Sequence, residues 1–318
     1  MKIAVIGASG LIGTRLVSFL KEKFEIVELS RSRGFDVVNR ESVQKVLSDI
    51  NPSIILHLAA KTNVDECEKD KENDLKKLVE LSLINQKSNL ISFGQINPLD
   101  WRDENSAFSI NTVGTKNLVD FSLKNNSKLI YISTDFVFSG NEEYYTEESL
   151  SSPINWYGQT KFWGEEFVNL LPNPLIVRLS YLYGYRNNIK KDFVWKIMEL
   201  LEAKKEISLV FDQIITPTFI DDIVFGLKLL IEKEAVGTYH LVGESFLSPF
   251  EIGQEITQIF SFETSKIKKV TGDEFYQNRA KRPFQTRLKN DKLEKLGFKT
   301  KTFKEALILI KNNLSGTL

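Results

Sequence analysis

Short apolar runs of strand length alternate with longer segments of helical periodicity through about residue 180 of this 318-residue chain. The pattern predicts strands at 2–7, 25–30, 53–59, 127–133 and 174–179, and helices at 11–23, 41–50, 107–124 and 157–171. Strands that alternate with helices in this way form βαβ units, whose strands run parallel and whose helices cover the sheet. The chain is therefore predicted to have an α/β fold with a Rossmann-like, doubly wound parallel sheet.

Composition and charge narrow the class of protein. The chain has 42 basic and 42 acidic residues, so its formal net charge is zero and nothing supports a nucleic-acid or membrane-surface partner. No apolar run approaches the ~18 residues that a membrane span needs. The single cysteine, Cys67, excludes an intramolecular disulfide and fits a reducing compartment, which we take as the cytoplasm. The only two histidines, His57 and His240, lie in apolar strand segments and are expected to be core residues, not metal ligands.

A glycine-rich turn joins the first predicted strand to the first predicted helix. It reads Gly7-Ala8-Ser9-Gly10-Leu11-Ile12-Gly13. Glycines allow a tight turn and a close approach of backbone N–H groups to a pyrophosphate, and the helix N-terminus favours the anion. We predict dinucleotide binding by Gly7, Ser9, Gly10, Leu11, Ile12 and Gly13; an ordinary glycine-rich turn is the alternative.

The end of the second predicted strand bears on the choice of cofactor. There a hydroxyl and a guanidinium, Ser30 and Arg31, follow Glu28. Arg presents a fork of donors that suits a 2′-phosphate, so NADP(H) is the preferred cofactor. In the alternative, Ser30 and Arg31 form a solvated turn and Glu28 binds the free 2′-OH of NAD(H).

Tyr157 and Lys161 stand four residues apart on a predicted helix, so both side chains project from one face. An ammonium group within about 4–6 Å lowers the pKa of a phenol from its reference value near 10. Such a tyrosine can exchange a proton with a carbonyl oxygen. Thr134, just past a predicted strand, completes a catalytic set.

The regular alternation weakens after Leu179. Helical segments near 191–204, 221–233, 249–260 and 302–312 follow it. We expect an NAD(P)-binding Rossmann domain over 1–180 and a smaller, mainly substrate-binding region over 181–318, with part of 213–235 returning to the first domain.

Nearly forty residues separate Asp65-Glu66-Cys67-Glu68 from the predicted helix at Ala107, where connections usually take a handful. We interpret residues of about 71–105 as an insertion and Cys67 as part of the loop that leads into it, without a role. Leu75, Leu78, Val79 and Leu83 recur at helical spacing, so the insertion should have some structure of its own.

Several segments together resemble the extended short-chain dehydrogenase/reductase superfamily, and within it the dTDP-4-dehydrorhamnose reductase branch. Besides the glycine-rich turn and the Tyr157–Lys161 pair, they are His57–Asp65, Ser133–Gly140, Pro153–Gly158, Arg178–Gly184, Asp212-Gln213, Pro217-Thr218, Arg282-Pro283 and Leu288. They occur in family order over nearly the whole chain outside the insertion. The resemblance implies reduction of the C4 ketone of a nucleotide-linked 6-deoxyhexulose by NAD(P)H, as in dTDP-rhamnose biosynthesis.

The same resemblance implies roles for individual residues. Tyr157 would protonate the alkoxide, Lys161 would hold the nicotinamide ribose, and Thr134 would hydrogen-bond the carbonyl oxygen. Asn111 would support the catalytic site. The remaining implied residues are Asp36 and Val37 at the adenine, Ala59 and Ala60 along the cofactor, and Asp135, Phe136 and Tyr181 at the substrate. A homodimer is also implied.

Alternatives on the same fold remain open. A nucleotide-sugar epimerase uses the same catalytic residues but holds NAD tightly. A non-enzymatic regulatory subunit, similar to the β subunit of methionine adenosyltransferase, is a second alternative. A dehydratase is disfavoured because Asp135 is followed by Phe136 where that class has a second acid. Arg15 stands where some members carry an acidic magnesium ligand, so no metal is predicted. By the same resemblance the insertion leaves the chain near the substrate opening. We expect a lid there that uses the apolar residues Leu75, Leu78, Val79 and Trp101, with burial of these residues at a subunit interface as the alternative.

Overall fold

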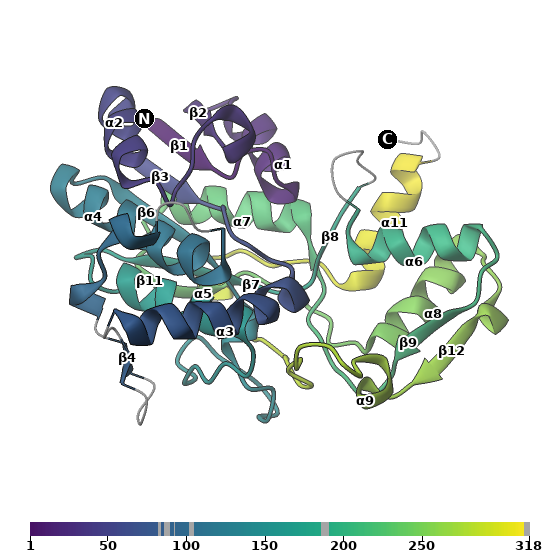
Figure 1. The fold of residues 1–318 in the computed structure, drawn as a ribbon. Coiled ribbons are helices and arrows are strands. Elements are labelled where there is room, and N and C mark those ends of the chain that lie inside the picture. The colour runs from purple at the N-terminus through teal and green to yellow at the C-terminus, as the bar shows by residue number, and fades with distance from the viewer. Residues whose placement is uncertain (82–83, 86–89, 92, 102–104, 186–190, 315–318) are drawn as a thin grey trace. The chain divides into compact units, whose positions relative to one another are not determined.

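The computed structural model describes residues 1–318 except 82–83, 86–89, 92, 102–104, 186–190 and 315–318 (Figure 1). The chain divides into two compact units, and each is described by itself. Unit 1 comprises Met1–Ser133 and Pro153–Ile176, and unit 2 comprises Thr134–Ser152 and Val177–Leu318. The domain division predicted from sequence, with its boundary at residue 180 and a returning segment within 213–235, stays a prediction.

The central sheet has six strands in the order β11-β7-β6-β3-β1-β2. Their bounds are β1 Lys2–Ile6, β2 Glu25–Leu29, β3 Ile54–His57, β6 Lys128–Thr134, β7 Leu175–Leu179 and β11 Gly237–His240. β1 pairs in parallel with β2 and β3, and β3 pairs in parallel with β6. The predicted α/β fold with a parallel, doubly wound sheet is confirmed.

The strand order fixes where a ligand can bind. From β1 the chain passes to β2 on one side and then to β3 on the other side of β1. In an open parallel sheet, the crevice at such a reversal, beyond the carboxyl ends of the strands, is the usual binding position. The glycine-rich turn follows β1, and Ala59 and Ala60 follow β3, so both lie at this switch point.

The α-helices in the described part of unit 1 connect and cover these strands. They are α1 Leu11–Leu20, α2 Arg40–Ile50, α3 Val64–Glu80, α4 Gly114–Asn125 and α5 Trp156–Val168. Several expected elements are shorter than predicted: the helix at 11–23 ends at Leu20, the helix at 157–171 ends at Val168, and the strand at 53–59 ends at His57. The helix expected at 107–124 does begin at Ala107, and it contains a π-helical segment, Ser109–Val113, before α4.

Helix α3 corrects the interpretation of the insertion. The side chain of Asn63 accepts a hydrogen bond from Glu66 N, and Asp65 and Glu66 stand in the first turn, where acidic groups favour a helix N-terminus. Asp65 to Cys67 are therefore helical, not a loop, and residues 71–80 belong to the same helix. Beyond it, β4 (Ile84–Asn85) pairs antiparallel with β5 (Leu90–Ile91).

The apolar residues assigned to a lid or a subunit interface pack largely inside unit 1. Leu78 and Trp101 are fully buried, and the ring centroid of Trp101 lies 4.5 Å from that of Phe108. Burial within unit 1 leaves neither side chain available to a second subunit, so the alternative of a subunit interface is wrong for these two residues, whereas the lid stays a prediction. Val79 remains exposed, and Leu83 lies outside the described residues.

Unit 2 surrounds a second apolar core. β8 (Leu182–Tyr183) pairs in parallel with β10 (Thr218–Phe219), and β9 (Ile207–Val210) with β12 (Ile267–Val270). Its helices are α6 Phe193–Glu202, α7 Ile220–Glu232, α8 Pro249–Phe260, α9 Gly272–Phe275, α10 Asp291–Lys295 and α11 Phe303–Leu314. Tyr183, Trp195, Phe219 and Phe303 are among the large side chains of this core. None of the helices in the described residues is long and apolar enough to span a membrane.

Candidate active site

The glycine-rich turn between β1 and α1 requires glycine at two positions for different reasons. Gly7 has φ +89°, and a Cβ on it would lie 2.7 Å from Ala59 N, so both its backbone conformation and the space around it exclude a side chain. A Cβ on Gly13 would lie 2.4 Å from Gly7 O, so α1 packs directly on the turn. The turn is shaped for close backbone contact, as dinucleotide binding demands.

The N-terminus of α1 is suited to an anion. Gly10 is the N-cap residue, no side chain caps the helix, and its first turn carries no acidic group. The first N–H groups of a helix have no intrahelical acceptor and carry partial positive charge. The N–H groups of Leu11, Ile12 and Gly13 stand in this first turn, so the prediction that they bind a pyrophosphate is compatible with the geometry.

Three hydroxyl groups meet at the ends of β1 and β2. Ser30 Oγ lies 3.0 Å from Ser32 Oγ, which lies 3.4 Å from Ser9 Oγ in the glycine-rich turn. Arg31 Nε lies 3.3 Å from Asp36 Oδ2, and its Nη1 donates to Asn105 Oδ1. Ser32 was not singled out from the sequence, although its alternation with Ser30 could have indicated a shared side.

Glu28, the alternative ribose ligand, is already engaged. Its carboxylate lies 2.6 Å from Lys21 Nζ and 2.7 Å from Arg33 Nη1. The hydrogen bond from Lys21 and the charge of Arg33 lower the pKa of Glu28. Since both carboxylate oxygens already have cationic partners, Glu28 is a poor acceptor for a ribose hydroxyl.

Val37, predicted to border the adenine, is held by α4. A Cβ on Gly114 would lie 2.7 Å from Val37 Cγ2, so the helix approaches this side chain closely. Asn117 Nδ2 donates to Val37 O at 2.8 Å. Asp36 receives a hydrogen bond from Val38 N at 3.0 Å. The segment after β2 is thus fixed by α4 and by its own turn.

Helix α5 brings the catalytic candidates of unit 1 together. Lys161 is buried, and its Nζ donates to Ile132 O at 2.7 Å and lies 3.9 Å from the ring centroid of Tyr131. Burial lowers the pKa of Lys161 to about 7. Tyr157 lies one helical turn earlier and is 9% exposed. Gly164 allows this packing, because a Cβ there would meet the hydroxyl of Tyr131.

Asn111 connects the loop after β3 to α5. Its Oδ1 accepts from Lys61 N at 2.8 Å, and its Nδ2 donates to Lys61 O at 3.1 Å and to Thr160 Oγ1 at 3.0 Å. The π-helical turn places Asn111 where all three partners are reached. Tyr131 and Thr160 were not identified from sequence; their roles depend on contacts between distant segments.

The remaining predicted residues lie in unit 2. Thr134, Asp135 and Phe136 are all buried, at and just beyond the end of β6. The ring centroids of Phe136 and Tyr181 are 6.4 Å apart. Tyr181 has φ +37°, an uncommon conformation for an aromatic residue, and such strain occurs most often at functional sites.

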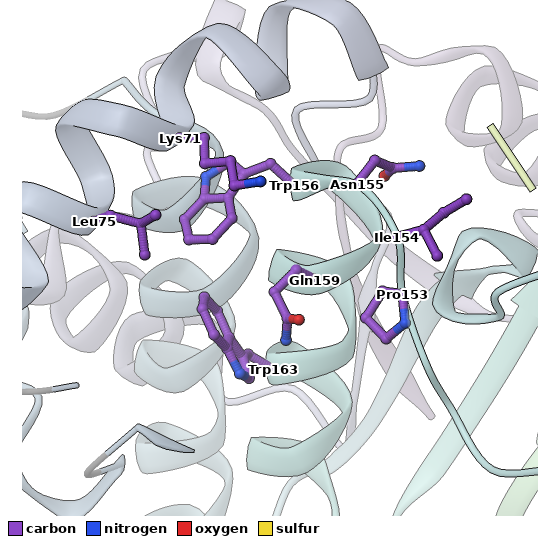
Figure 2. Close-up of a pocket in the computed structure, with 8 residues that line it drawn as sticks. All are labelled: Lys71, Leu75, Pro153, Ile154, Asn155, Trp156, Gln159 and Trp163. Carbon is purple, nitrogen blue, oxygen red and sulfur yellow. The ribbon is translucent and has the colours of Figure 1, made fainter. Parts of the chain in front are cut away.

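A small cavity of about 180 Å³ lies beside α5 in unit 1 (Figure 2). It is lined by Lys71 and Leu75 of α3, by Pro153, Ile154 and Asn155, and by Trp156, Gln159 and Trp163 of α5. Neither Tyr157 nor Lys161 lines it. The two tryptophan rings meet edge to face at 5.3 Å, so the cavity is bounded by packed aromatic side chains.

The residues expected to lack a catalytic role are buried. His57 contacts Thr115 Oγ1 through Nε2 at 3.1 Å, and His240 contacts Lys289 O through Nδ1 at 2.9 Å. The interpretation of both as core histidines is confirmed. Cys67 lies within α3, and burial raises the pKa of its thiol to about 12, so it is not a ready nucleophile.

A glycine-rich turn at the β1/β3 switch point, with a buried lysine one turn beyond a tyrosine, defines a dinucleotide-binding protein of the extended short-chain dehydrogenase/reductase class. The sequence model of the family described as RmlD substrate binding domain matches residues 1–81 and 101–315. The chain belongs to this family. The unmatched stretch, 82–100, is shorter than the insertion predicted at about 71–105, as the extent of α3 requires.

Similar proteins cover nearly the whole chain. A crystal structure of dTDP-4-dehydrorhamnose reductase from Bacillus anthracis in complex with NADP is 31% identical, with a TM-score of 0.81, and covers 98% of this chain and 99% of that one. The spore coat polysaccharide biosynthesis protein SpsK of Bacillus subtilis is 28% identical over 96% of this chain and 95% of its own. Methionine adenosyltransferase 2 subunit beta of Rattus norvegicus is 26% identical over 95% of this chain and 84% of its own.

Proposed function

We propose that the protein is an NADPH-dependent reductase of a nucleotide-linked 4-keto-6-deoxyhexose, with NADH as the alternative cofactor. The observation that carries the proposal is the buried Lys161, which lies on the same helix as Tyr157. Its Nζ donates to Ile132 O of β6. The neighbouring Thr160 links this part of the helix to Asn111. A desolvated lysine one helical turn from a tyrosine is the arrangement that proton transfer to a carbonyl oxygen uses, so it supports an enzyme over the regulatory alternative.

The site has the parts that a ketone reduction needs. A bound NADPH supplies the hydride. Tyr157 donates the proton that the carbonyl oxygen requires as it becomes an alkoxide. Lys161 places a positive charge beside the phenolate that this transfer leaves. Because burial lowers the pKa of Lys161 to about 7 in the ligand-free protein, an anionic neighbour is needed to hold its charge fully.

Cofactor preference follows from the residues at the end of β2. Ser9, Ser30 and Ser32 supply hydroxyls, and Arg31 supplies a guanidinium beside them. This set offers donors to a 2′-phosphate, whereas the engaged Glu28 offers little to a 2′-OH. The NADP bound in the Bacillus anthracis relative supports the same choice.

The substrate residues belong to unit 2. Thr134 carries a hydroxyl for the sugar oxygen, and Phe136 and Tyr181 present aromatic surface for the 6-deoxyhexose. The name of the Bacillus anthracis relative supports a nucleotide-linked keto sugar as the substrate. A homodimer and a cytoplasmic location complete the proposal, and light scattering of the purified protein tests the first.

The test is NADPH oxidation with a panel of nucleotide-linked 4-keto-6-deoxyhexoses. Tyr157→Phe keeps the ring and removes the proton donor, so turnover should fall roughly 10²–10⁴-fold while NADPH binding persists. Tyr144→Phe, at an exposed tyrosine, is the matched control and should leave turnover unchanged. A wild-type protein that binds NADPH but reduces no member of the panel would support the regulatory alternative, and NAD that survives purification would support the epimerase.

A further inference from the structure

The carboxyl group of Asp135 is enclosed by three hydroxyl groups from three segments of unit 2. Thr134 Oγ1, at the end of β6, donates to Asp135 Oδ1 at 3.0 Å. Ser180 Oγ, just after β7, donates to Oδ2 at 2.8 Å. The hydroxyl of Thr286, which donates to Ile214 O at 3.5 Å, also faces this carboxyl and lowers its pKa. Asp135 is itself 1% exposed, so its bonds are made away from water.

The ionised carboxylate dictates the direction of the Thr134 hydroxyl. A carboxylate only accepts hydrogen bonds, so the single proton of the threonine hydroxyl must point to Asp135. One of the two oxygen lone pairs of Thr134 accepts from Phe136 N at 3.3 Å. Within the described residues of unit 2, Thr134 is then left with one lone pair for a ligand, so it can accept a hydrogen bond but cannot donate one.

That direction does not suit a ketone. A carbonyl oxygen only accepts, so Thr134 can bind it only when its own proton is released from Asp135. A proton on Asp135 allows this exchange, because the carboxylic acid then donates to Thr134 Oγ1 and the threonine O–H turns to the ligand. The alcohol product carries its own O–H and pairs with the ionised form instead.

We propose that Asp135 is a positioning residue that sets the hydrogen-bond direction of Thr134, so that the protein binds its ketone with Asp135 protonated and the corresponding alcohol with Asp135 ionised. The proposal rests on the proposed reductase function. The reaction keeps its balance: the hydride comes from NADPH and the proton from Tyr157, while the proton of Asp135 only changes the direction of a hydrogen bond.

The surroundings make a proton on Asp135 accessible. Burial raises the pKa of Asp135 to about 6, although its hydroxyl partners lower it. The groups that face Asp135 are the neutral side chains of Thr134, Ser180 and Thr286 and the phenol of Tyr181, which in turn interacts with the cation of Arg282. Both forms of Asp135 are thus populated around pH 6.

The kinetic test compares pH profiles of kcat/KM for ketone reduction at saturating NADPH. The wild-type value should fall about tenfold per pH unit once Asp135 ionises. In the Asp135→Asn variant, the amide can donate to Thr134 and accept from Ser180, as the protonated acid does. The variant should therefore remain active, and its pH profile should lack this descending limb. Ser180→Ala removes a donor to the carboxylate and should move the limb to higher pH. A limb that stays in place in both variants overturns the proposal, since a merely structural role would leave it there.

Dead-end complexes measure the same preference without turnover. At pH 8, Asp135→Asn should bind the ketosugar with NADP⁺ at least about tenfold more tightly than wild type, because it needs no proton uptake. It should bind the alcohol with NADPH more weakly. Equal changes in both affinities contradict the proposal.

A measurement without any sugar separates this inference from the proposed function. The carboxyl of Asp135 can be titrated in ligand-free protein by ¹³C NMR, with Asp135→Asn to assign the signal. Thr134→Val should raise the titration midpoint, because the charged form loses a donor. An unchanged midpoint overturns the inference even if the ketosugar is reduced. A raised midpoint in a protein that reduces no ketosugar upholds the coupling and rejects the proposed function.

Discussion

Arg31 has protein partners that a bound 2′-phosphate would have to share. Its guanidinium contacts Asp36 and Asn105, yet its side chain is 63% exposed, so the ion pair with Asp36 is solvent-screened and weak. A 2′-phosphate carries more charge than one carboxylate and would compete well for the same donors. The geometry is therefore compatible with a guanidinium that turns from Asp36 to the cofactor.

Arg31→Ala should raise the Kd for NADPH roughly 10–100-fold, the scale of a lost charge-assisted hydrogen bond, with little effect on NADH. Fluorescence titration with the two cofactors measures both constants. Arg33→Ala is the matched control, since Arg33 pairs with Glu28 and should affect the two cofactors alike. If Arg31→Ala weakens the binding of NADPH and NADH equally, Arg31 does not bind the 2′-phosphate.

Residues whose role follows from local spacing could be predicted, and those that depend on contacts between distant segments could not. Tyr157 and Lys161 lie on one helix, so their common face follows from helical geometry. Asp135 could be placed next to Thr134 from sequence, but its enclosure depends on Ser180 and Thr286, far along the chain. No sequence pattern indicates that these three segments meet.

At the scale of elements, α3 holds the beginnings of two helices that carry candidate site residues. Glu68 Oε2 accepts from Trp156 N at 2.7 Å, at the start of α5. Asp74 Oδ2 accepts from Trp156 Nε1 at 2.8 Å and from Phe108 N at 3.2 Å, just before the π-helical turn with Asn111. Figure 1 shows α3 and α5 side by side, and the two helices are in contact.

Asp74→Ala should lower the free energy of unfolding by about 1–3 kcal/mol for each buried donor that finds no other acceptor. Chemical denaturation measures the change. Glu72→Ala, on the exposed side of the same helix, controls for helix propensity and should have little effect. A small, equal change in both variants would mean that Asp74 does not secure these helix ends.

The sequence prediction that a loop and an insertion stand where α3 lies was wrong for a physical reason. Asn63 and Glu66 carry an N-terminal capping signal, but the helix they begin is mostly polar on its surface, and the long segment behind it suggested a loop. Its buried side includes Asp74, a carboxylate in a position where an apolar residue is usual. A polar residue that is buried to bind distant backbone groups breaks the periodicity on which sequence prediction relies.

At the scale of the whole molecule, the buried apolar strands of the sheet are the feature most readily predicted. β1 and β3 are continuous apolar runs because both faces of a parallel sheet are covered. The division into units is harder to predict, because its boundaries fall inside β6, between Ser133 and Thr134, and inside β7, between Ile176 and Val177. A boundary within a strand leaves no linker composition to detect.

Each unit contains one buried histidine, so the acid stability of both can be compared. Burial lowers the pKa of His57, in unit 1, and of His240, in unit 2, to about 3 from 6.5. The unfolded chain takes up these protons near pH 6.5 and the folded chain does not. Each histidine therefore removes about 1.4 kcal/mol of stability per pH unit as the pH falls from about 6.5 toward 3.

Two buried acids act in the opposite direction over part of this range. Burial raises the pKa values of Asp135 and Asp192 to about 6, so the folded chain binds their protons first as the pH falls. Their contribution to stability increases between about pH 6 and 3.8 and offsets that of the histidines. The contributions of these four groups to the free energy of unfolding of the wild type should thus nearly cancel between about pH 6 and 3.8. The effect of one histidine can be measured only by comparing a histidine variant with the wild type.

Two variants remove a titrating ring but keep its hydrogen bond. The amide of His57→Gln can still bond to Thr115 Oγ1, and the amide of His240→Asn can still donate to Lys289 O. Relative to wild type, each variant should gain about 1.4 kcal/mol per pH unit between about pH 6 and 4, measured by urea denaturation. Because β6 and β7 run through both units, both substitutions should move one common transition. Two transitions, with His57→Gln shifting one and His240→Asn the other, would mean that the units unfold independently in spite of the strands they share.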